Sequence, residues 1–307
     1  MIHDYRERVN QVCKYIDAHL DYKLSLDQLA ELSHFSKYHF SRIFTSVTGD
    51  TPFAYISKQR LARAAAYLRD TDLHVLEISL RCGFESASNF NAAFKKHFGH
   101  TPTEMRVKAK ARQDRKISQS VRNPEEAGPA PNPYDQTVKH SLLRRVWQMQ
   151  ATIEELPLME VAYVRQVGSY LETYRAWAKL GMWAAQHGWF PPEQSFIGIS
   201  LDDPAVTEEE VCRYDACVTV PNTLSRADAP PEIQFQTLPG GRYAKFYFYD
   251  TTDKLALLYQ SIFGNWLPDS EYDPDDRYCL EFCMNDPALD PQGKAKVDLY
   301  IPIKARA

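Results

Sequence analysis

The chain has 307 residues, of which 44% are hydrophobic and 25% charged, so it is neither disordered nor collagen-like. At roughly 150 residues per domain, this length indicates about two domains. An uncharged run at 180–192 spans 13 residues and is too short and polar to cross a bilayer. The first ten residues carry charges of both signs without an apolar core, unlike a signal peptide. We therefore expect a cytoplasmic protein without a membrane partner.

The net charge of −4 averages two unlike halves of the chain. Residues 1–112 hold 17 Lys/Arg and 12 Asp/Glu, a net charge of +5, whereas the remainder holds 19 and 28, a net charge of −9. This asymmetry indicates two units with different partners. A stretch at 123–133 contains four prolines and a glycine, which is typical of a linker. We expect domains at 1–112 and 151–307, with a linker at 113–150 that contains a short helix at 141–149 and argues against rigid contact between the domains.

The cysteines do not indicate a metal site. Of the six, Cys212/Cys217 and Cys279/Cys283 are close pairs, but neither forms a CxxC motif or has a histidine within ten residues. Apolar strand positions explain them better, with reduced thiols in a cytoplasmic chain. We expect neither a metal nor a cofactor.

The first half is predicted to be helical and internally duplicated. Ser25 to Gln28 forms a capping box, Thr51-Pro52 and Thr101-Pro102 are helix starts, and Gly49 and Gly99 stand where helices end. These positions, with Phe40/Phe90 and Phe44/Phe94, match at a constant offset of 50. Each copy is predicted to be a helix-turn-helix, with second helices at 36–47 and 86–98.

The second helix of such a motif lies in the DNA major groove, so its exposed side chains are candidate base contacts. Arg42 is the strongest candidate for guanine, and Asn89 for adenine. The alternative for these residues is an ordinary solvated helix face. The candidate DNA-binding residues are Ser36, Lys37, Tyr38, Ser41, Arg42 and Thr45 in the first motif, and Ser86, Ala87, Ser88, Asn89 and Lys96 in the second.

The second half has strand-like segments, and it too is duplicated. Strands are predicted at 161–164, 196–199, 216–220, 243–249, 280–284 and 297–301, with helices at 170–187 and 253–266. Identities at an offset of 83, such as Trp183/Trp266, indicate two strand–helix–strand–strand units. The predicted fold class is therefore multidomain: an all-α double helix-turn-helix domain followed by an α+β domain with a cleft between the helices of its two repeats.

Glu281 is the leading ligand candidate, because it lies in the apolar strand Cys-Leu-Glu-Phe-Cys-Met, and the equivalent position of the other repeat is Gly198. A buried carboxylate is costly unless something compensates it, and a bound cation beside aromatic rings would do so. A glutamate on the solvated side of the strand, or one paired with an arginine, is the alternative. The aromatic candidates are Tyr163, Tyr170, Trp177, Phe248, Trp266 and Tyr300, although most aromatic residues of this half are expected in the core.

The residues carry two resemblances to known families. Over about 8–108, LSLDQLAELSHFSKYHFSRIF and CGFESASNFNAAFKKHFGHTPTEMR resemble the DNA-binding domain of AraC/XylS regulators, which implies binding of double-stranded DNA in adjacent major grooves. Ser79 and Ala92 depart from this pattern, and Ala92 weakens the case for base contacts by the second motif. Over about 152–304, Gly168-Ser-Tyr170, Asp202-Asp-Pro204, Pro239-Gly-Gly-Arg-Tyr-Ala244 and Glu281 resemble the GyrI-like (SOUL/multidrug-sensor) domain. This second resemblance implies binding of a small cationic or amphipathic effector, with Glu281 as the pocket glutamate, in a Rob-type domain order.

Together these features predict a transcription regulator, an activator in our interpretation, whose second domain senses a small molecule. RNA polymerase is a further candidate partner. We expect no catalytic residues. The alternatives are a GyrI-like hydrolase in which Glu281 is a general base, and a DNA-binding protein whose second domain binds a partner instead of a ligand.

Overall fold

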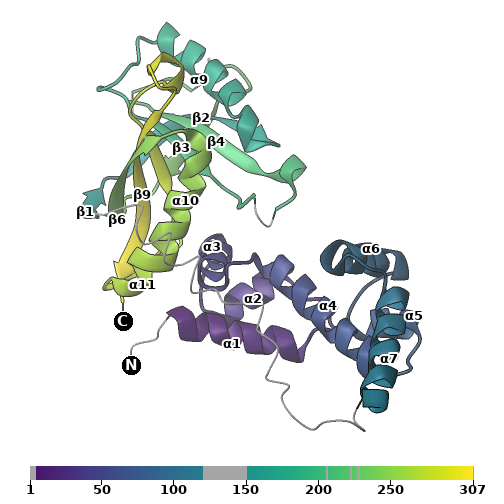
Figure 1. Ribbon diagram of the computed structural model, residues 1–307. Coiled ribbons are helices and arrows are strands. Elements are labelled where there is room, and N and C mark those ends of the chain that lie inside the picture. The colour runs from purple at the N-terminus through teal and green to yellow at the C-terminus, as the bar shows by residue number, and fades with distance from the viewer. Residues whose placement is uncertain (1–4, 120–150, 205–206, 222, 227–228, 307) are drawn as a thin grey trace.

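The computed structural model describes residues 5–119, 151–204, 207–221, 223–226 and 229–306. Its N-terminal part is helical, as predicted, and α4 joins two smaller units (Figure 1). The helices are α1 (Tyr5–Ala18), α2 (Leu26–Leu32), α3 (Lys37–Thr48), α4 (Pro52–Asp70), α5 (Val75–Arg81), α6 (Ala87–Phe98) and α7 (Pro102–Gln119).

Local capping explains where these helices begin and end. Ser25 and Gln28 form the reciprocal capping box at α2, and the Thr51 side chain accepts a hydrogen bond from the Ala54 amide at the start of α4. Gly49 and Gly99 end α3 and α6 in the left-handed conformation, at φ values of 79° and 75°. The two helix-turn-helix units therefore repeat both in sequence and in backbone conformation.

The structure extends α7 to Gln119, past the expected domain boundary at 112. The Pro-rich stretch and the helix predicted at 141–149 lie outside the described residues.

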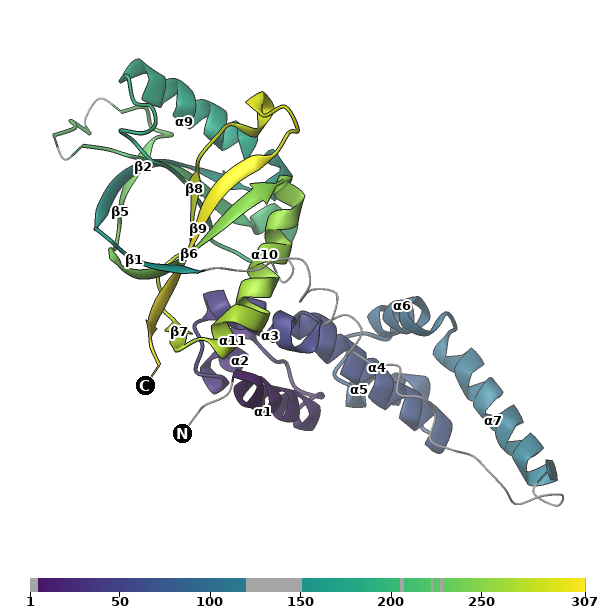
Figure 2. The same ribbon diagram turned by 60° about the vertical axis from the view of Figure 1, so that its left-hand side comes forward.

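The second domain is built on one antiparallel sheet that curls on itself (Figure 2). Its strand order is β1-β6-β9-β8-β3-β4-β2-β5, with β7 paired to β9. The strands are β1 (Thr152–Leu156), β2 (Met159–Val167), β3 (Phe196–Ser200), β4 (Arg213–Thr219), β5 (Gln234–Leu238), β6 (Gly241–Asp250), β7 (Tyr272–Pro274), β8 (Leu280–Cys283) and β9 (Ala295–Ala305).

This order is symmetric about its centre. The central strands β3 and β8 pair antiparallel, with Gly198 opposite Glu281, and outward from them β4, β2 and β5 mirror β9, β6 and β1. The offset of 83 therefore corresponds to a pseudo-twofold axis between β3 and β8. All six predicted strands are present. In addition, β1 pairs with β6 and β5 pairs with β2, so each repeat gives its first strand to the other repeat's half of the sheet.

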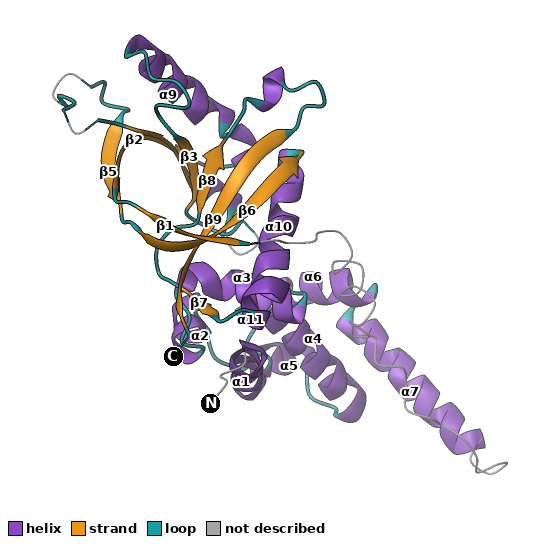
Figure 3. Cartoon of the chain, turned by 90° about the vertical axis from the view of Figure 1, so that its left-hand side faces the viewer, coloured by secondary structure: helices purple, strands orange, loops and turns teal. Residues whose placement is uncertain are grey.

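Both predicted helices cover the same face of the sheet (Figure 3). Helix α9 (Tyr174–Gln186) packs on β2 and β4, whereas α10 (Leu255–Ser261) packs on β6 and β9. Helix α10 continues as a π-helical turn at Ile262–Trp266 and then as α11 (Leu267–Asp269). The opposite face holds a separate apolar cluster that includes Tyr163, Tyr243 and Tyr300.

The two domains share one hydrophobic core, so the expectation of loosely connected domains is wrong for this structure. Phe40 and Phe44 of α3 belong to the same buried cluster as Leu258 and Phe263 of the second domain. All three ribbon views place α3 beside α10 and α11 (Figures 1, 2 and 3). The Tyr5 hydroxyl donates a 2.9 Å hydrogen bond to Asp273, which adds a polar contact. The composition of the linker gave no information about this docking, because apolar side chains elsewhere drive it.

Candidate functional site

Glu281 lies at the pseudo-twofold axis, on the face of the sheet that carries the helices. Its side chain is only 6% exposed. One carboxylate oxygen, Oε1, accepts hydrogen bonds from the Tyr259 hydroxyl at 2.9 Å and from the Ser200 hydroxyl at 3.0 Å. Burial raises the pKa of Glu281, and the two hydroxyls and the nearby Arg42 partly oppose that rise.

Gly198 makes room for this carboxylate. A Cβ atom at Gly198 would lie 2.1 Å from the Tyr214 hydroxyl oxygen and 3.1 Å from Oε2 of Glu281. Such distances are well inside van der Waals contact, so position 198 has to lack a side chain. The glycine in one repeat and the glutamate in the other are therefore structurally complementary.

Two tyrosines complete the surroundings of Glu281. Burial, reinforced by the charge of Glu281, holds the pKa of Tyr259 and that of Tyr214 well above their usual range, so both hydroxyls stay protonated. Sequence reasoning missed Tyr259, Tyr214 and Ser200. The internal repeat contained a signal for one of them, because Tyr259 corresponds to Ala176 at the offset of 83, just as Glu281 corresponds to Gly198. The polar pocket is thus built partly at positions where the two repeats differ.

Of the predicted aromatic ligand residues, Tyr170 and Trp177 lie nearest to this arrangement. Their ring centroids are 5.8 Å and 6.3 Å from that of Tyr214, both in edge-on contacts. The Tyr170 hydroxyl also donates a hydrogen bond within the loop that follows β3, to the Asp202 carbonyl at 2.8 Å. Through their contacts with Tyr214, Tyr170 and Trp177 therefore connect the surroundings of Glu281 with the first repeat.

The other four aromatic candidates lie elsewhere. Tyr163 and Tyr300 belong to the cluster on the opposite face of the sheet, where their hydroxyls donate to Gln234 and Glu154. Phe248 is fully buried beneath α10, and Trp266 packs edge-on against another core ring. The structure therefore does not bring these four residues together with Glu281.

The candidate DNA-binding face of α3 is covered by the second domain. Ser41, expected on the solvent side, is 1% exposed, and its hydroxyl donates a 2.6 Å hydrogen bond to Asp203. The hydroxyl oxygens of Ser36 and Thr45 are also buried, and neither has a hydrogen-bond partner among the described residues. Lys37 and Tyr38 lie on this helix, with side chains outside those described.

Arg42 reaches from α3 into the surroundings of Glu281. Its guanidinium carbon lies 4.3 Å from the centroid of the Tyr259 ring, and Nη1 is 3.6 Å from the sulfur of Cys279. Burial opposes the charged form of Arg42, whereas its interactions with Cys279, Tyr259, Asp203 and Glu281 favour that form, and the pKa of Arg42 is raised. The guanidinium is therefore a charged group held in a largely buried acidic and aromatic environment.

The second motif remains open to solvent. Ser88, Asn89 and Lys96 of α6 are exposed. The Ser86 side chain accepts a hydrogen bond from the Asn89 amide and so caps the helix, while Ala87 starts its first turn. In this arrangement the candidate DNA contacts of the second motif are accessible and those of the first are covered.

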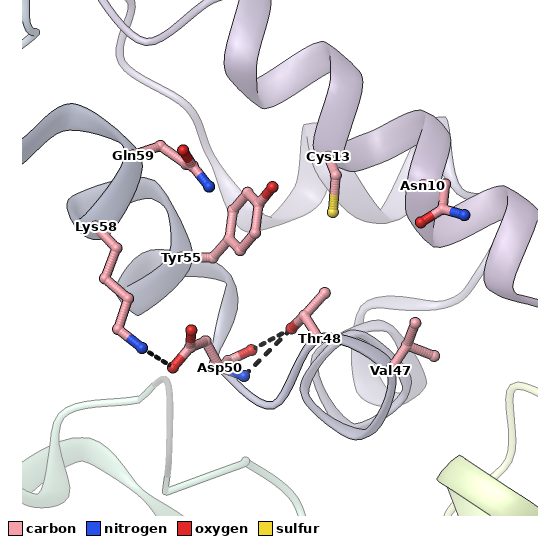
Figure 4. Close-up of a pocket in the computed structure, with 8 residues that line it drawn as sticks. All are labelled: Asn10, Cys13, Val47, Thr48, Asp50, Tyr55, Lys58 and Gln59. Carbon is pink, nitrogen blue, oxygen red and sulfur yellow. Dashed lines mark hydrogen bonds and ion pairs between the residues drawn. The ribbon is translucent and has the colours of Figure 1, made fainter. Parts of the chain in front are cut away.

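Two hollows lie near these elements, and neither contains Glu281. One of about 310 Å³ lies between α1, α3 and α4, where an ion pair between Lys58 and Asp50 closes one side (Figure 4). The other, of about 210 Å³, is lined by Tyr170 and Pro204, one residue from the Asp203 that binds Ser41.

The described ranges contain neither a cluster of metal ligands nor a helix able to span a membrane. Nowhere in these ranges do three or more His, Cys, Asp or Glu side chains group as a metal ion would require. Likewise, none of the described helices combines the length and hydropathy needed to cross a bilayer.

These features define the class of protein. Residues 29–108 match a helix-turn-helix domain family, and residues 149–304 match the family described as GyrI-like small molecule binding domain. The second match covers half of the chain, which therefore belongs to the GyrI-like family and carries an AraC-type helix-turn-helix domain in front of it. Both predicted resemblances and the predicted fold class are confirmed.

Individual relatives match the first domain. The chain is 43% identical over 88 residues to the right origin-binding protein of Escherichia coli K12, a match that covers 29% of this chain and 30% of that protein. It is 38% identical over 100 residues to the probable transcription factor PqrA of Proteus vulgaris, covering 32% of this chain and 82% of that protein. Among solved structures, the DNA-binding domain of AdpA in complex with a target DNA aligns at 29% identity, over 34% of this chain and 96% of the AdpA domain, with a TM-score of 0.34.

Proposed function

We propose that the protein is a transcription regulator that binds double-stranded DNA with its first domain and senses a small organic molecule with its second. One observation carries the proposal: the chain joins two helix-turn-helix units to a GyrI-like domain with a carboxylate buried among tyrosines. Helix-turn-helix units supply sequence recognition, and a buried acid beside aromatic rings favours a cation. RNA polymerase and the activating direction remain predictions that follow from this role.

We infer that Glu281 binds a ligand and is not a catalytic base. Hydroxyl groups of Tyr259 and Ser200 hold its Oε1 in place, and the raised pKa reflects burial. A binding carboxylate benefits from such fixed neighbours, since they keep it positioned before a ligand arrives. Relatives of the first domain are transcription regulators, which agrees with a binding role.

The DNA-binding part of the proposal is tested with a duplex selected from a random pool by the full chain. Arg42→Ala is expected to weaken binding to this duplex far more than Lys96→Ala, because a bidentate arginine–guanine contact contributes about 1–3 kcal/mol of discrimination. Lys96→Ala is expected to lower the salt dependence by about one phosphate contact. Equal losses in the two variants, or an unchanged salt slope for Lys96→Ala, would contradict this division of roles.

The sensing part is tested by thermal unfolding of the full chain with cationic and neutral amphiphiles. A ligand that binds only the folded state raises the melting temperature, and at 100 times its dissociation constant it adds about 2.7 kcal/mol of stability. We expect cations to stabilise the protein and Glu281→Gln to remove the effect. If no cation stabilises the protein, the second domain is instead a partner-binding module, and ligand turnover abolished by Glu281→Gln would indicate the hydrolase.

A further inference from the structure

We propose that Arg42 occupies the cation site of the second domain, so that a guanidinium-like organic cation binding there displaces Arg42 and frees the first helix-turn-helix for DNA. This inference rests on the proposed function and adds how the bound cation would regulate DNA binding. In this view the protein carries its own competitor for the ligand, and the competitor is the strongest candidate for contacting DNA bases.

The groups around Arg42 suit a delocalised cation. Its guanidinium carbon lies 4.3 Å from the Tyr259 ring centroid, and the hydroxyl of that ring donates a hydrogen bond to Glu281. The flat cation of Arg42 thus lies on the face of the Tyr259 ring, and that tyrosine is hydrogen-bonded to the buried carboxylate of Glu281. This is how proteins bind delocalised cations, because the ring face and the acid attract the charge while a flat ion keeps contact with the ring.

Groups from both repeats surround the guanidinium of Arg42. Tyr259 and Cys279 belong to the second repeat, whereas Asp203 belongs to the first, and all three contribute to the electrostatic environment of Arg42. The positive charge of Arg42 also acts on Tyr170 of the first repeat. Arg42 therefore lies where the symmetry of the fold places a ligand cleft, and the resident side chain is itself a guanidinium.

The closed arrangement contains buried polar atoms that lack partners within the described part of the chain. In this arrangement Ser36 Oγ, His39 Nδ1 and Thr45 Oγ1 are buried and have no hydrogen-bond partners among the described residues. A buried polar atom without a partner loses the hydrogen bonds that it would make with water. Such groups oppose the closed arrangement, because water or DNA would satisfy them once they are exposed, and a bound cation adds to this opposition.

Docking of α3 and binding of α3 to DNA exclude each other. Arg42 cannot lie over Tyr259 and in a major groove at the same time, and the hydrogen bond from Ser41 to Asp203 holds the same face of α3. A cation that needs the Tyr259 face and DNA that needs α3 therefore both select the open arrangement. Two ligands that select one state favour each other's binding by the same factor.

The probe for the test is phenylguanidinium, with phenylurea as its neutral counterpart of similar shape. We expect phenylguanidinium to bind Arg42→Ala about tenfold more tightly than the unmodified chain, because the internal competitor is gone. Glu281→Gln is expected to abolish binding, and phenylurea is expected not to bind. Since Arg42 is also a candidate DNA contact, the effect of displacement on DNA binding is measured with a different variant.

The DNA arm uses a variant that leaves Arg42 in place. Asp203→Ala removes the hydrogen bond with Ser41, and we expect it to raise affinity for the selected duplex about tenfold and to reduce the effect of the probe. The matched control is Asp286→Ala, since Asp286 is the repeat-related aspartate and is exposed on the first turn after β8. This control is expected to behave like the unmodified chain.

The outcomes separate this inference from the proposed function. If probe binding depends on Glu281 but is equal in Arg42→Ala and the unmodified chain, displacement of Arg42 is overturned and sensing stands. If Asp203→Ala and Asp286→Ala bind DNA alike, the inference is overturned and DNA binding stands. If phenylguanidinium binds neither chain, both the inference and the proposed cation site fail.

Discussion

His39 provides a quantitative test of the docked arrangement, because it is buried where α3 meets the second domain. It is 1% exposed, and its Nε2 donates a 2.6 Å hydrogen bond to the Asp275 carbonyl. Its ring lies 5.4 Å from that of Phe263. Burial lowers the pKa of His39 to about 4, with Arg42 adding to the shift and Asp275 and Asp276 opposing it.

The pKa difference sets the size and sign of the effect. An undocked His39 has a pKa near 6.5, so the docked state binds fewer protons between pH 6.5 and pH 4. Docking is therefore fully stable above pH 6.5 and loses stability as the pH falls toward 4. At about 1.4 kcal/mol per pKa unit, the loss reaches about 2 kcal/mol at pH 5 and about 3 kcal/mol at pH 4.

Small-angle X-ray scattering of the full chain between pH 4.5 and pH 7.5 measures this opening as an increase in the radius of gyration. The control is His39→Gln, whose amide is able to donate to the Asp275 carbonyl but does not titrate. We expect the unmodified chain to expand below about pH 6 and the variant to stay compact. Identical profiles for the two chains would refute the assignment of the transition to His39.

Two further predictions concern the stability of the second domain, each measured by urea unfolding. Gly198→Ala places a Cβ within 2.1 Å of the Tyr214 hydroxyl and is expected to lower the free energy of unfolding by about 1–3 kcal/mol. The control Gly181→Ala, in α9, meets open space and is expected to be neutral or stabilising. Equal stability of the two variants would contradict the close packing at Gly198. Arg165→Ala removes the two 2.7 Å hydrogen bonds that Arg165 donates to the fully buried Asp215, and it is expected to lower the free energy of unfolding by about 3 kcal/mol. The control Arg242→Ala breaks an exposed ion pair with Glu155 at 3.8 Å and is expected to cost less than about 1 kcal/mol. Unchanged stability of Arg165→Ala would show that Asp215 does not depend on Arg165.

Local signals in the sequence predicted most of the fold. Side-chain caps and left-handed glycines act over three or four residues, so Ser25, Thr51, Gly49 and Gly99 placed helix ends correctly. Strands rich in apolar and aromatic residues were also predicted correctly, because their pattern is likewise local in the sequence. Strands β1 and β5 were missed, because Thr-Ile-Glu-Glu-Leu and Gln-Phe-Gln-Thr-Leu are polar segments at the two ends of the sheet order and alternate weakly.

The site was predictable only in part. A carboxylate within an apolar strand identified Glu281, and the repeat gave Gly198 as its equivalent position. That the two residues lie opposite each other across β3 and β8 was seen only in the structure. The partners Tyr259 and Ser200 come from other elements, so their proximity depends on tertiary packing. Docking of α3 on α10 was missed because Arg42 is chemically suited both to a guanine and to an acidic aromatic pocket. Nothing in the sequence of α3 distinguishes these two partners.

Reciprocal coupling between DNA and cation tests the central claim most directly. The measurement is the affinity of the full chain for phenylguanidinium, determined with and without a saturating amount of the selected duplex. Because both are expected to select the undocked state, the duplex should tighten probe binding about tenfold, by the same factor by which the probe tightens DNA binding. Equal probe affinities with and without the duplex would show that Arg42 does not link the two sites.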